Sequence, residues 1–286
     1  MFSRISNSWE LVKASYAVLR SDKELIVFPI VSFIGVIIVT ISFAVPMFAT
    51  GIFQALAQER VTRTGAEAFA FIIGFLFYLV MYTVIIFANT ALVGAAMIRL
   101  QGGHPTLGDG FRIAFQRITT ILGYALISAT VGMILRAISE RSGIVGTIIS
   151  SILGFAWSVV TFLVVPVLVV ENVGPIEAVK RSGSLLKQTW GEQLVGSFSI
   201  GTIFGLLGVV VILVGVLLTV VVAATKSVAL MVLVIGLTIL ALLALSLIAS
   251  TLSGIYQAAL YRYATEGDTS GYFSEELIQG AFKSKR

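Results

Sequence analysis

Hydrophobic and polar positions along this 286-residue chain alternate in long blocks rather than at short intervals. Six blocks run for roughly 18 to 35 residues without a charged side chain, at or beyond the length that a helix needs to cross a bilayer. Lipid cannot hydrogen-bond a backbone, so such blocks must close their amide bonds internally as helices. The pattern therefore predicts six transmembrane spans, at about residues 25–50, 68–98, 118–136, 144–170, 194–222 and 229–261.

The segment before the first span has a different pattern, with apolar residues on one helical face and charged residues on the others. The apolar stripe has spacings of four, three, four and three, and consists of Ile5, Trp9, Val12, Tyr16 and Leu19. Lys13 and Arg20 fall on other faces. A helix of this kind is suited to the membrane interface, so we predict an interfacial helix over 5–24.

The same design recurs after the fourth span, where a second interfacial helix is predicted over 175–190. Its stripe is formed by Ile176, Val179, Gly183, Leu186 and Trp190. The two segments align without a gap, since Val12-Lys13 matches Val179-Lys180 and Leu19-Arg20 matches Leu186-Lys187. A weaker third copy over 107–117 follows Pro105. We interpret the chain as three repeated units, each an interfacial helix followed by a transmembrane hairpin.

These elements define an all-α fold, a polytopic transmembrane helix bundle with two or three cytoplasmic interfacial amphipathic helices. A single transmembrane domain is expected over 1–264, followed by a short cytoplasmic tail over 265–286. In the tail, a turn is expected at Glu266-Gly267-Asp268, before a short helix that Ser274 caps. The apolar side of this short helix would carry Leu277, Ile278 and Phe282.

The distribution of lysine and arginine predicts the orientation of the protein in the membrane. Of the 19 lysines and arginines, fourteen precede the first span, follow the last one, or lie in the second and fourth loops. The other side holds only Arg60, Arg63, Arg136, Arg141 and Lys226. Positively charged loops resist translocation, so both termini are predicted to be cytoplasmic, in the cell (inner) membrane. The net charge of +5 then points to anionic lipid as a partner rather than nucleic acid, and protein partners are not indicated.

Candidate chemistry is sparse. The chain has no cysteine and one histidine, His104, which removes thiolate chemistry and leaves no pattern for a metal or cofactor. Between their end residues, the predicted spans contain no Asp, Glu, Lys, Arg or His, which disfavours energised transport and intramembrane hydrolysis. The expected role is therefore not enzymatic. A lipid-metabolising enzyme would require Glu171, Glu177 and His104 to converge on one site.

Two groups of residues are candidate sites. The first would bind lipid headgroups and consists of Lys13, Arg20, Lys180, Arg181 and Lys187. The second is the intramembrane polar pair Asn89 and Thr90, suited to bonds between helices or to contact with a solute. The favoured hypothesis is a protein that binds anionic lipid and organises the membrane or a partner complex. The alternative is a facilitator or channel for a neutral or lipid-like solute, with a pathway near kinks at Pro46 and Pro166.

The chain also resembles a family of uncharacterised six-span prokaryotic membrane proteins. The resemblance is carried by Trp9-Glu10-Leu11, by the run from Glu171 to Ala178 and by the run from Ala259 to Ala264. More distantly, the chain is similar to the membrane domain attached to some glycerophosphodiester phosphodiesterases. The catalytic domain of those enzymes has no counterpart here, so the resemblance implies an architecture and no phosphodiesterase activity.

Overall fold

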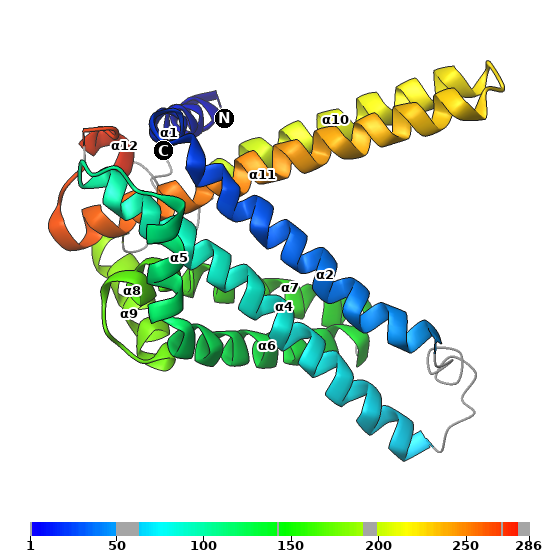
Figure 1. Cartoon of the computed structure of the whole chain (residues 1–286), viewed down its shortest axis with the longest axis horizontal. Helices are drawn as coiled ribbons and strands as arrows, with labels where there is room; N and C mark the ends of the chain where they lie inside the picture. The colour runs from blue at the N-terminus through cyan, green and yellow to red at the C-terminus, as the bar shows by residue number, and fades with distance from the viewer. Residues whose placement is uncertain (1, 50–62, 142, 191–198, 270, 280–286) are drawn as a thin grey trace. The chain divides into compact units, whose positions relative to one another are not determined.

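A computed structural model gives the arrangement of the chain, and it describes all residues except 1, 50–62, 142, 191–198, 270 and 280–286. The described residues form helices joined by short turns and contain no strand (Figure 1). The elements are α1 (Phe2–Ser21), η1 (Lys23–Ile26), α2 (Val27–Ala49), α4 (Arg63–Leu100), α5 (Leu107–Gln116), α6 (Ile118–Arg141), α7 (Gly143–Val160), α8 (Val164–Val170), α9 (Pro175–Trp190), α10 (Ser199–Ala223), α11 (Val228–Glu266) and α12 (Glu275–Gln279). The predicted all-α class is confirmed.

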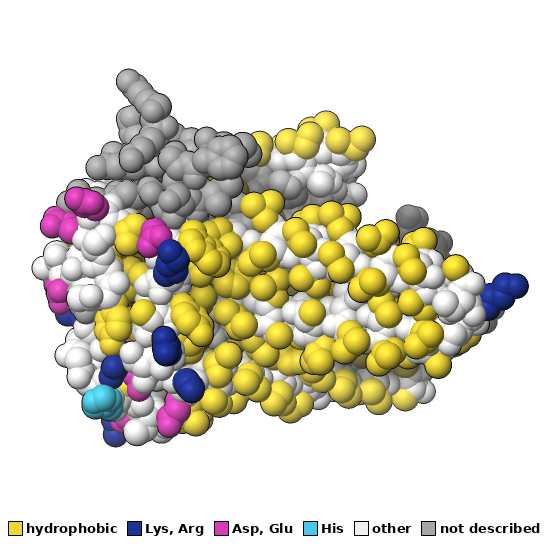
Figure 2. Space-filling model, turned by 90° about the horizontal axis from the view of Figure 1, so that it is seen from above, with side chains coloured by type: hydrophobic (Ala, Val, Ile, Leu, Met, Phe, Trp, Pro, Cys, Tyr) yellow, Lys and Arg dark blue, Asp and Glu magenta, His cyan; other side chains and the backbone are white. Residues whose placement is uncertain are grey.

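Six helices of the described chain are long and apolar enough to cross a membrane, as the block pattern predicts. They cover Lys23–Ala49, Phe71–Leu100, Ile118–Glu140, Gly143–Val170, Ile203–Ala223 and Val228–Glu266. Hydrophobic side chains cover the helices along most of their length in Figure 2, whereas charged side chains gather near helix ends. Soluble monomers rarely expose large apolar patches of this kind, so the surface itself indicates a multi-pass membrane protein.

The helices fall into two compact units that are not continuous in sequence. Unit 1 contains Met1–Pro29, Ala95–Thr106 and Lys187–Arg286, and unit 2 contains Ile30–Gly94 and Leu107–Leu186. In unit 1, α10 and α11 run side by side as a long hairpin, and α1 packs against both (Figure 1). In unit 2, α6 and α7 form a second hairpin.

Two glycines set the packing within unit 2. A Cβ built on Gly94 of α4 would lie 3.0 Å from the Ile113 side chain of α5, and one built on Gly123 of α6 would lie 2.8 Å from the Pro175 ring. The short helix α5 therefore lies close against α4, and the start of α9 lies close against α6. Pro175 is the first residue of α9, as expected because the first turn of a helix does not need the proline N–H.

The predicted tail is confirmed where the structure describes it. Gly267 ends α11 in a left-handed conformation with φ of +70°, and the Leu277 N–H donates to Ser274 Oγ at 3.3 Å, which caps α12. Ile278 is buried, as predicted for the apolar side of this helix, while Phe282 lies outside the described residues.

Candidate functional site

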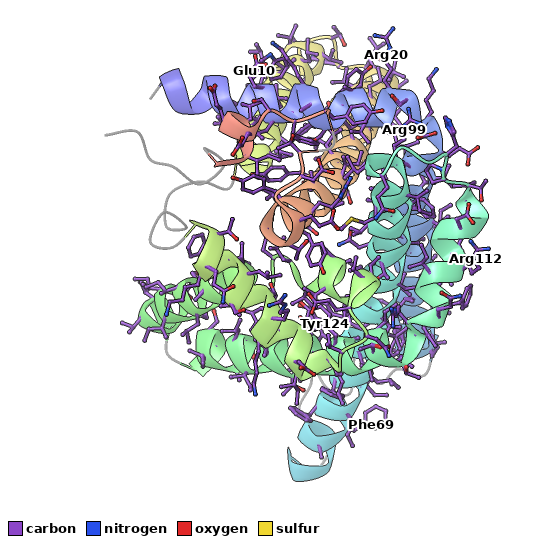
Figure 3. The ribbon with its side chains drawn as sticks, turned by 90° about the vertical axis from the view of Figure 1, so that its left-hand side faces the viewer. Glu10, Arg20, Phe69, Arg99, Arg112 and Tyr124 are labelled. Atoms are coloured by element: carbon purple, nitrogen blue, oxygen red, sulfur yellow. The ribbon has the colours of Figure 1, made fainter. Side chains whose placement is uncertain are left out.

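The helix α1 buries one face against α10 and α11 of unit 1 and presents the opposite face outward. The buried residues are Leu11, Val12, Ala14, Ser15, Val18 and Leu19. The outward stripe has spacings of four, three and four, and contains Trp9, Lys13, Tyr16 and Arg20. Figure 3 shows Glu10 and Arg20 on this helix.

This division corrects the predicted stripe. Val12 and Leu19 are buried as expected, but Trp9 is 48% exposed and Tyr16 is 54% exposed, on the same side as the basic residues. The prediction grouped the aromatic residues with Val12 and Leu19 because their spacing matches, and it placed the basic residues on other faces. A helix whose inward face is already filled by small and aliphatic residues has no room for them. The outward face of α1 is therefore aromatic and basic together.

The helix α9 has the same division in the same register. Ala178, Ser182, Leu185 and Leu186 are buried, and they match Leu11, Ser15, Val18 and Leu19 of α1 in the gap-free alignment. The exposed side carries Lys180 and Lys187, which match Lys13 and Arg20. Ile176 matches Trp9 and is 62% exposed, so this position lies on the outward side in both helices.

The helix α5 carries a shorter version of this pattern. Gly110 and Ala114 are buried, while Arg112 is exposed and Phe115 is 64% exposed. Arg112 and Phe115 have the same spacing of three as Lys13 and Tyr16 on α1. The predicted bounds of 107–117 agree with the observed helix, Leu107–Gln116.

The five predicted headgroup residues differ in their ion pairs. Lys13 Nζ lies 2.9 Å from Glu10 Oε1, and Arg181 Nε lies 3.1 Å from Glu171 Oε1. With the described residues, Arg20, Lys180 and Lys187 form no ion pair. Exposed ion pairs contribute little to stability, so all five cations are accessible to an external anion at small cost.

The predicted intramembrane pair lies on α4 in unit 2. Thr90 is fully buried, and its hydroxyl donates to the Ile86 carbonyl one turn earlier at 2.7 Å. Asn89 is half-buried. The Thr90 hydroxyl donates within its own helix and can still accept a hydrogen bond, while no hydrogen bond of the Asn89 side chain is seen among the described residues.

A polar site that the sequence analysis missed lies where the fourth span is interrupted. Pro166 in α8 has no N–H and its ring excludes the carbonyl of Phe162, so the helix breaks over residues 161–163. The Ser182 hydroxyl of α9 accepts from the Leu163 N–H at 3.0 Å and donates to the Val160 carbonyl at 2.7 Å. A side chain from another helix thus satisfies the freed backbone groups.

Further hydroxyl groups surround this break. Tyr124 of α6 is buried, and its hydroxyl lies near the hydroxyl groups of Ser128 and Thr161 (Figure 3 labels Tyr124). Pro166 was the available sequence signal, since it predicted a kink in this span. The spacing of Tyr124, Ser128 and Thr161 gave no indication that they would meet.

A second missed cluster joins the ends of helices in unit 1. Arg262 of α11 is buried, donates to the Leu100 carbonyl at the end of α4, and pairs with Glu266 and Asp268. The available signal was the similarity between Ala95 to Leu100 and Ala258 to Tyr263, which places an arginine at the end of each span.

The arginine at the end of α4 has its own partners. Arg99 Nε lies 3.0 Å from Asp22 Oδ2 and 3.1 Å from the Tyr272 hydroxyl. The hydrogen bond with Ser21, followed by Arg99, lowers the pKa of Tyr272 from its usual value near 10. These contacts connect the end of α4, the end of α1 and the tail.

The residues considered for an enzyme are held in separate local contacts. His104 Nδ1 lies 3.1 Å from Arg99 Nη1 in unit 1, and Glu171 pairs with Arg181 in unit 2. Glu177 is exposed in the first turn of α9. In the described part of the chain, no three His, Asp or Glu side chains are placed to hold a metal ion.

Comparison with known proteins places the chain in a family. The model of a family of unknown function (DUF6159) matches residues 68–272, which is more than half of the chain. The chain belongs to this family. The DUF6159 region contains α5 and α9, whereas α1 precedes it. No curated protein and no solved structure matches the chain.

Proposed function

We propose that this member of DUF6159 is a non-enzymatic integral membrane protein that binds anionic lipid headgroups through α1 and α9. The contacting residues are Lys13, Arg20, Lys180, Arg181 and Lys187. By holding anionic lipid at several points around the spans, the protein would organise the membrane or a partner complex. Both termini would lie on the cytoplasmic side of the cell membrane, where anionic lipid headgroups attract basic segments.

The observation that supports this proposal most directly is the shared register of α1 and α9. Four matched positions are buried in both helices, and two matched positions present a cation outward in both. Trp9 and Tyr16 lie between the cations of α1, and aromatic rings of this kind are enriched at the headgroup level of membranes. A helix with this outward face has apolar, aromatic and cationic groups that match the chemistry of an interface.

The test compares two variants with the same change in net charge. In the first, the five headgroup residues are replaced by Gln. In the second, the control, Arg60, Arg63, Arg136, Arg141 and Lys226 are replaced by Gln. Both proteins are purified with native lipid, and the ratio of bound phosphatidylglycerol to phosphatidylethanolamine is measured by mass spectrometry.

The proposal predicts loss of the anionic preference in the first variant alone. Each cation near an anionic surface contributes about 1 kcal/mol, so the preference should fall by about tenfold or more. An equal fall in both variants would indicate a general charge effect. An unchanged ratio in the first variant would show that these residues do not bind headgroups.

The alternative function is a facilitator or channel for a neutral or lipid-like solute. It is supported by the hydroxyl groups of Tyr124, Ser128 and Thr161 around the interrupted fourth span, together with half-buried Asn89. Interrupted spans with polar neighbours form the binding sites of many transporters. We also propose that the chain shares its architecture with the membrane domain attached to some glycerophosphodiester phosphodiesterases. Flux of glycerol or a short-chain lipid into vesicles containing the protein, lost in Tyr124→Phe with Ser128→Ala, would favour the alternative function.

A further inference from the structure

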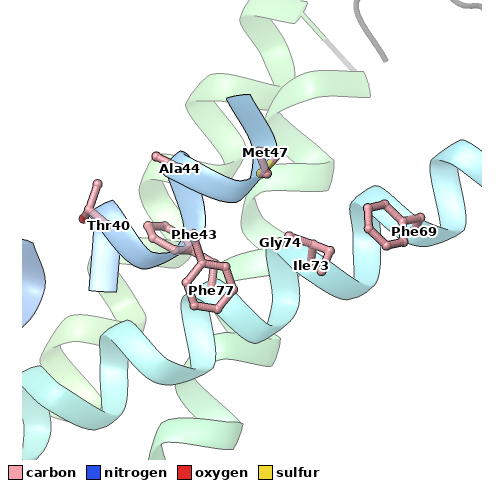
Figure 4. A pocket seen from close by; sticks show the side chains of 8 residues that line it. All are labelled: Thr40, Phe43, Ala44, Met47, Phe69, Ile73, Gly74 and Phe77. Atoms are coloured by element: carbon pink, nitrogen blue, oxygen red, sulfur yellow. The ribbon is translucent and has the colours of Figure 1, made fainter. Parts of the chain in front are cut away.

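Between α2 and α4 there is an open hollow of about 270 Å³, at the end of these spans far from Lys23 and Arg99. Figure 4 shows the described residues that line it, and these come from α2 and α4. The lining residues are Thr40, Phe43, Ala44, Met47, Phe69, Ile73, Gly74 and Phe77. All of them lie in unit 2.

The hollow exists because α2 and α4 are in contact near Gly35 and diverge toward Gly74. A Cβ built on Gly35 would lie 2.6 Å from the Val84 side chain, so the helices are in contact there. Phe43 and Phe77 still meet edge to face, with ring centroids 5.4 Å apart. A Cβ built on Gly74, one turn further, would have no atom within 4 Å.

The chemistry of the lining excludes a polar occupant. Among the described lining residues, Thr40 alone has a side-chain hydroxyl or charge, and its hydroxyl donates to the Val36 carbonyl at 2.8 Å. A polar molecule would therefore lose its hydrogen bonds to water and gain few in return. Water is disfavoured for the same reason, because a buried water needs several polar partners.

The position of the hollow along the spans points to its occupant. All lining residues except Phe69 lie within the candidate spans Lys23–Ala49 and Phe71–Leu100. Other faces of these spans carry exposed apolar side chains, including Ile41, Val45, Phe48 and Ile72. The hollow is therefore part of a surface whose length and composition suit contact with hydrocarbon. We infer that the hollow between α2 and α4 binds one acyl chain of a bilayer phospholipid. This site is independent of the proposed headgroup contacts, which lie on other helices.

The test uses a phospholipid whose acyl chain carries a photoactivatable diazirine, incorporated into vesicles with the full-length protein. After illumination, labelled residues are identified by mass spectrometry. The inference predicts that label concentrates on the lining residues of α2 and α4. Label spread over these helices in proportion to exposure would overturn it, and so would protection of the lining residues from the label, as a second copy of the protein seated there would cause.

Filling variants add a second readout. Gly74→Leu places a side chain in the open space, so labelling of the lining should be lost, falling to the level on the exposed residues of α10. Gly236→Leu is the matched control, because a Cβ at Gly236 of α11 also meets no atom within 4 Å. Ala44→Leu fills the same hollow from α2 and should give the same loss. Unchanged labelling in a folded filling variant would contradict the inference, and the wild-type labelling pattern decides the question if neither variant folds.

Discussion

The Ser182 hydroxyl of α9 accepts a hydrogen bond from the Leu163 N–H at 3.0 Å, where the fourth span is interrupted. Its counterpart in the repeat, Ser15 of α1, is equally buried, yet its Oγ has no hydrogen-bond partner among the described residues. The two serines occupy matching helix positions, but only Ser182 bonds to the backbone of an interrupted helix. The two helices therefore share their packing, and Ser182 has an additional role.

Replacing Ser182 by Ala should destabilise the protein by about 1–3 kcal/mol, because the Leu163 N–H and the Val160 carbonyl would be left buried without partners. Ser15→Ala is the matched control, since it removes a buried hydroxyl that has no such bond, and it should be neutral or slightly stabilising. Thermal unfolding of both variants in detergent measures the difference. Equal effects at the two positions would contradict the role given to Ser182.

Much of the fold could be predicted from the sequence because lipid imposes a strict rule on long apolar blocks. The six spans, the bounds of α5, the start of α9 at Pro175 and the Ser274 cap all follow from local patterns. The face of α1 that packs against other helices could not be predicted from the local pattern. A period of 3.6 identifies faces, but it does not say which face packs against other helices when aromatic residues occupy one of them.

The clusters at Ser182 and Arg262 could not be predicted because they join segments distant in sequence. Arg262 contacts Leu100 across 162 positions, and Ser182 contacts Val160 across 22. The internal similarity between segments indicates the helix on which Ser182 and Arg262 lie. Which backbone group each would meet depends on how the helices pack.

Arg262 should be essential for the end of α4 to remain attached to α11. Arg262→Met keeps the aliphatic stem but leaves the Leu100 carbonyl without its donor, so the free energy of unfolding should fall by about 1–3 kcal/mol. Arg112→Met is the control, because Arg112 pairs with Asp109 on an exposed surface and should change stability by less than about 0.5 kcal/mol. Thermal unfolding compares the two, and similar losses would argue against a specific role for Arg262.

Removing the acid beside Lys13 should strengthen binding of anionic lipid. Glu10→Gln removes the carboxylate that pairs with Lys13, so the net charge of the outward face of α1 rises by one. Phosphatidylglycerol retention should therefore rise about fivefold at low salt. The rise should diminish at high salt because exposed charges are screened. Glu140→Gln removes the partner of Arg136 at the other end of a span and should cause no rise. If both variants gained equally, the effect would not be specific to α1.

The central claim is that six spans carry the basic helices α1 and α9 to the cytoplasmic side of the membrane. Because the chain has no cysteine, each introduced cysteine is unique and its labelling reports one position. The most direct measurement is the reaction of single-cysteine variants with a membrane-impermeant maleimide, before and after the cells are permeabilised. The account predicts that Lys13→Cys, Lys180→Cys and Arg286→Cys react only after permeabilisation, whereas Arg60→Cys and Lys226→Cys react in intact cells. Labelling of Lys13→Cys and Lys180→Cys on opposite sides, or of Lys13→Cys in intact cells, would contradict it.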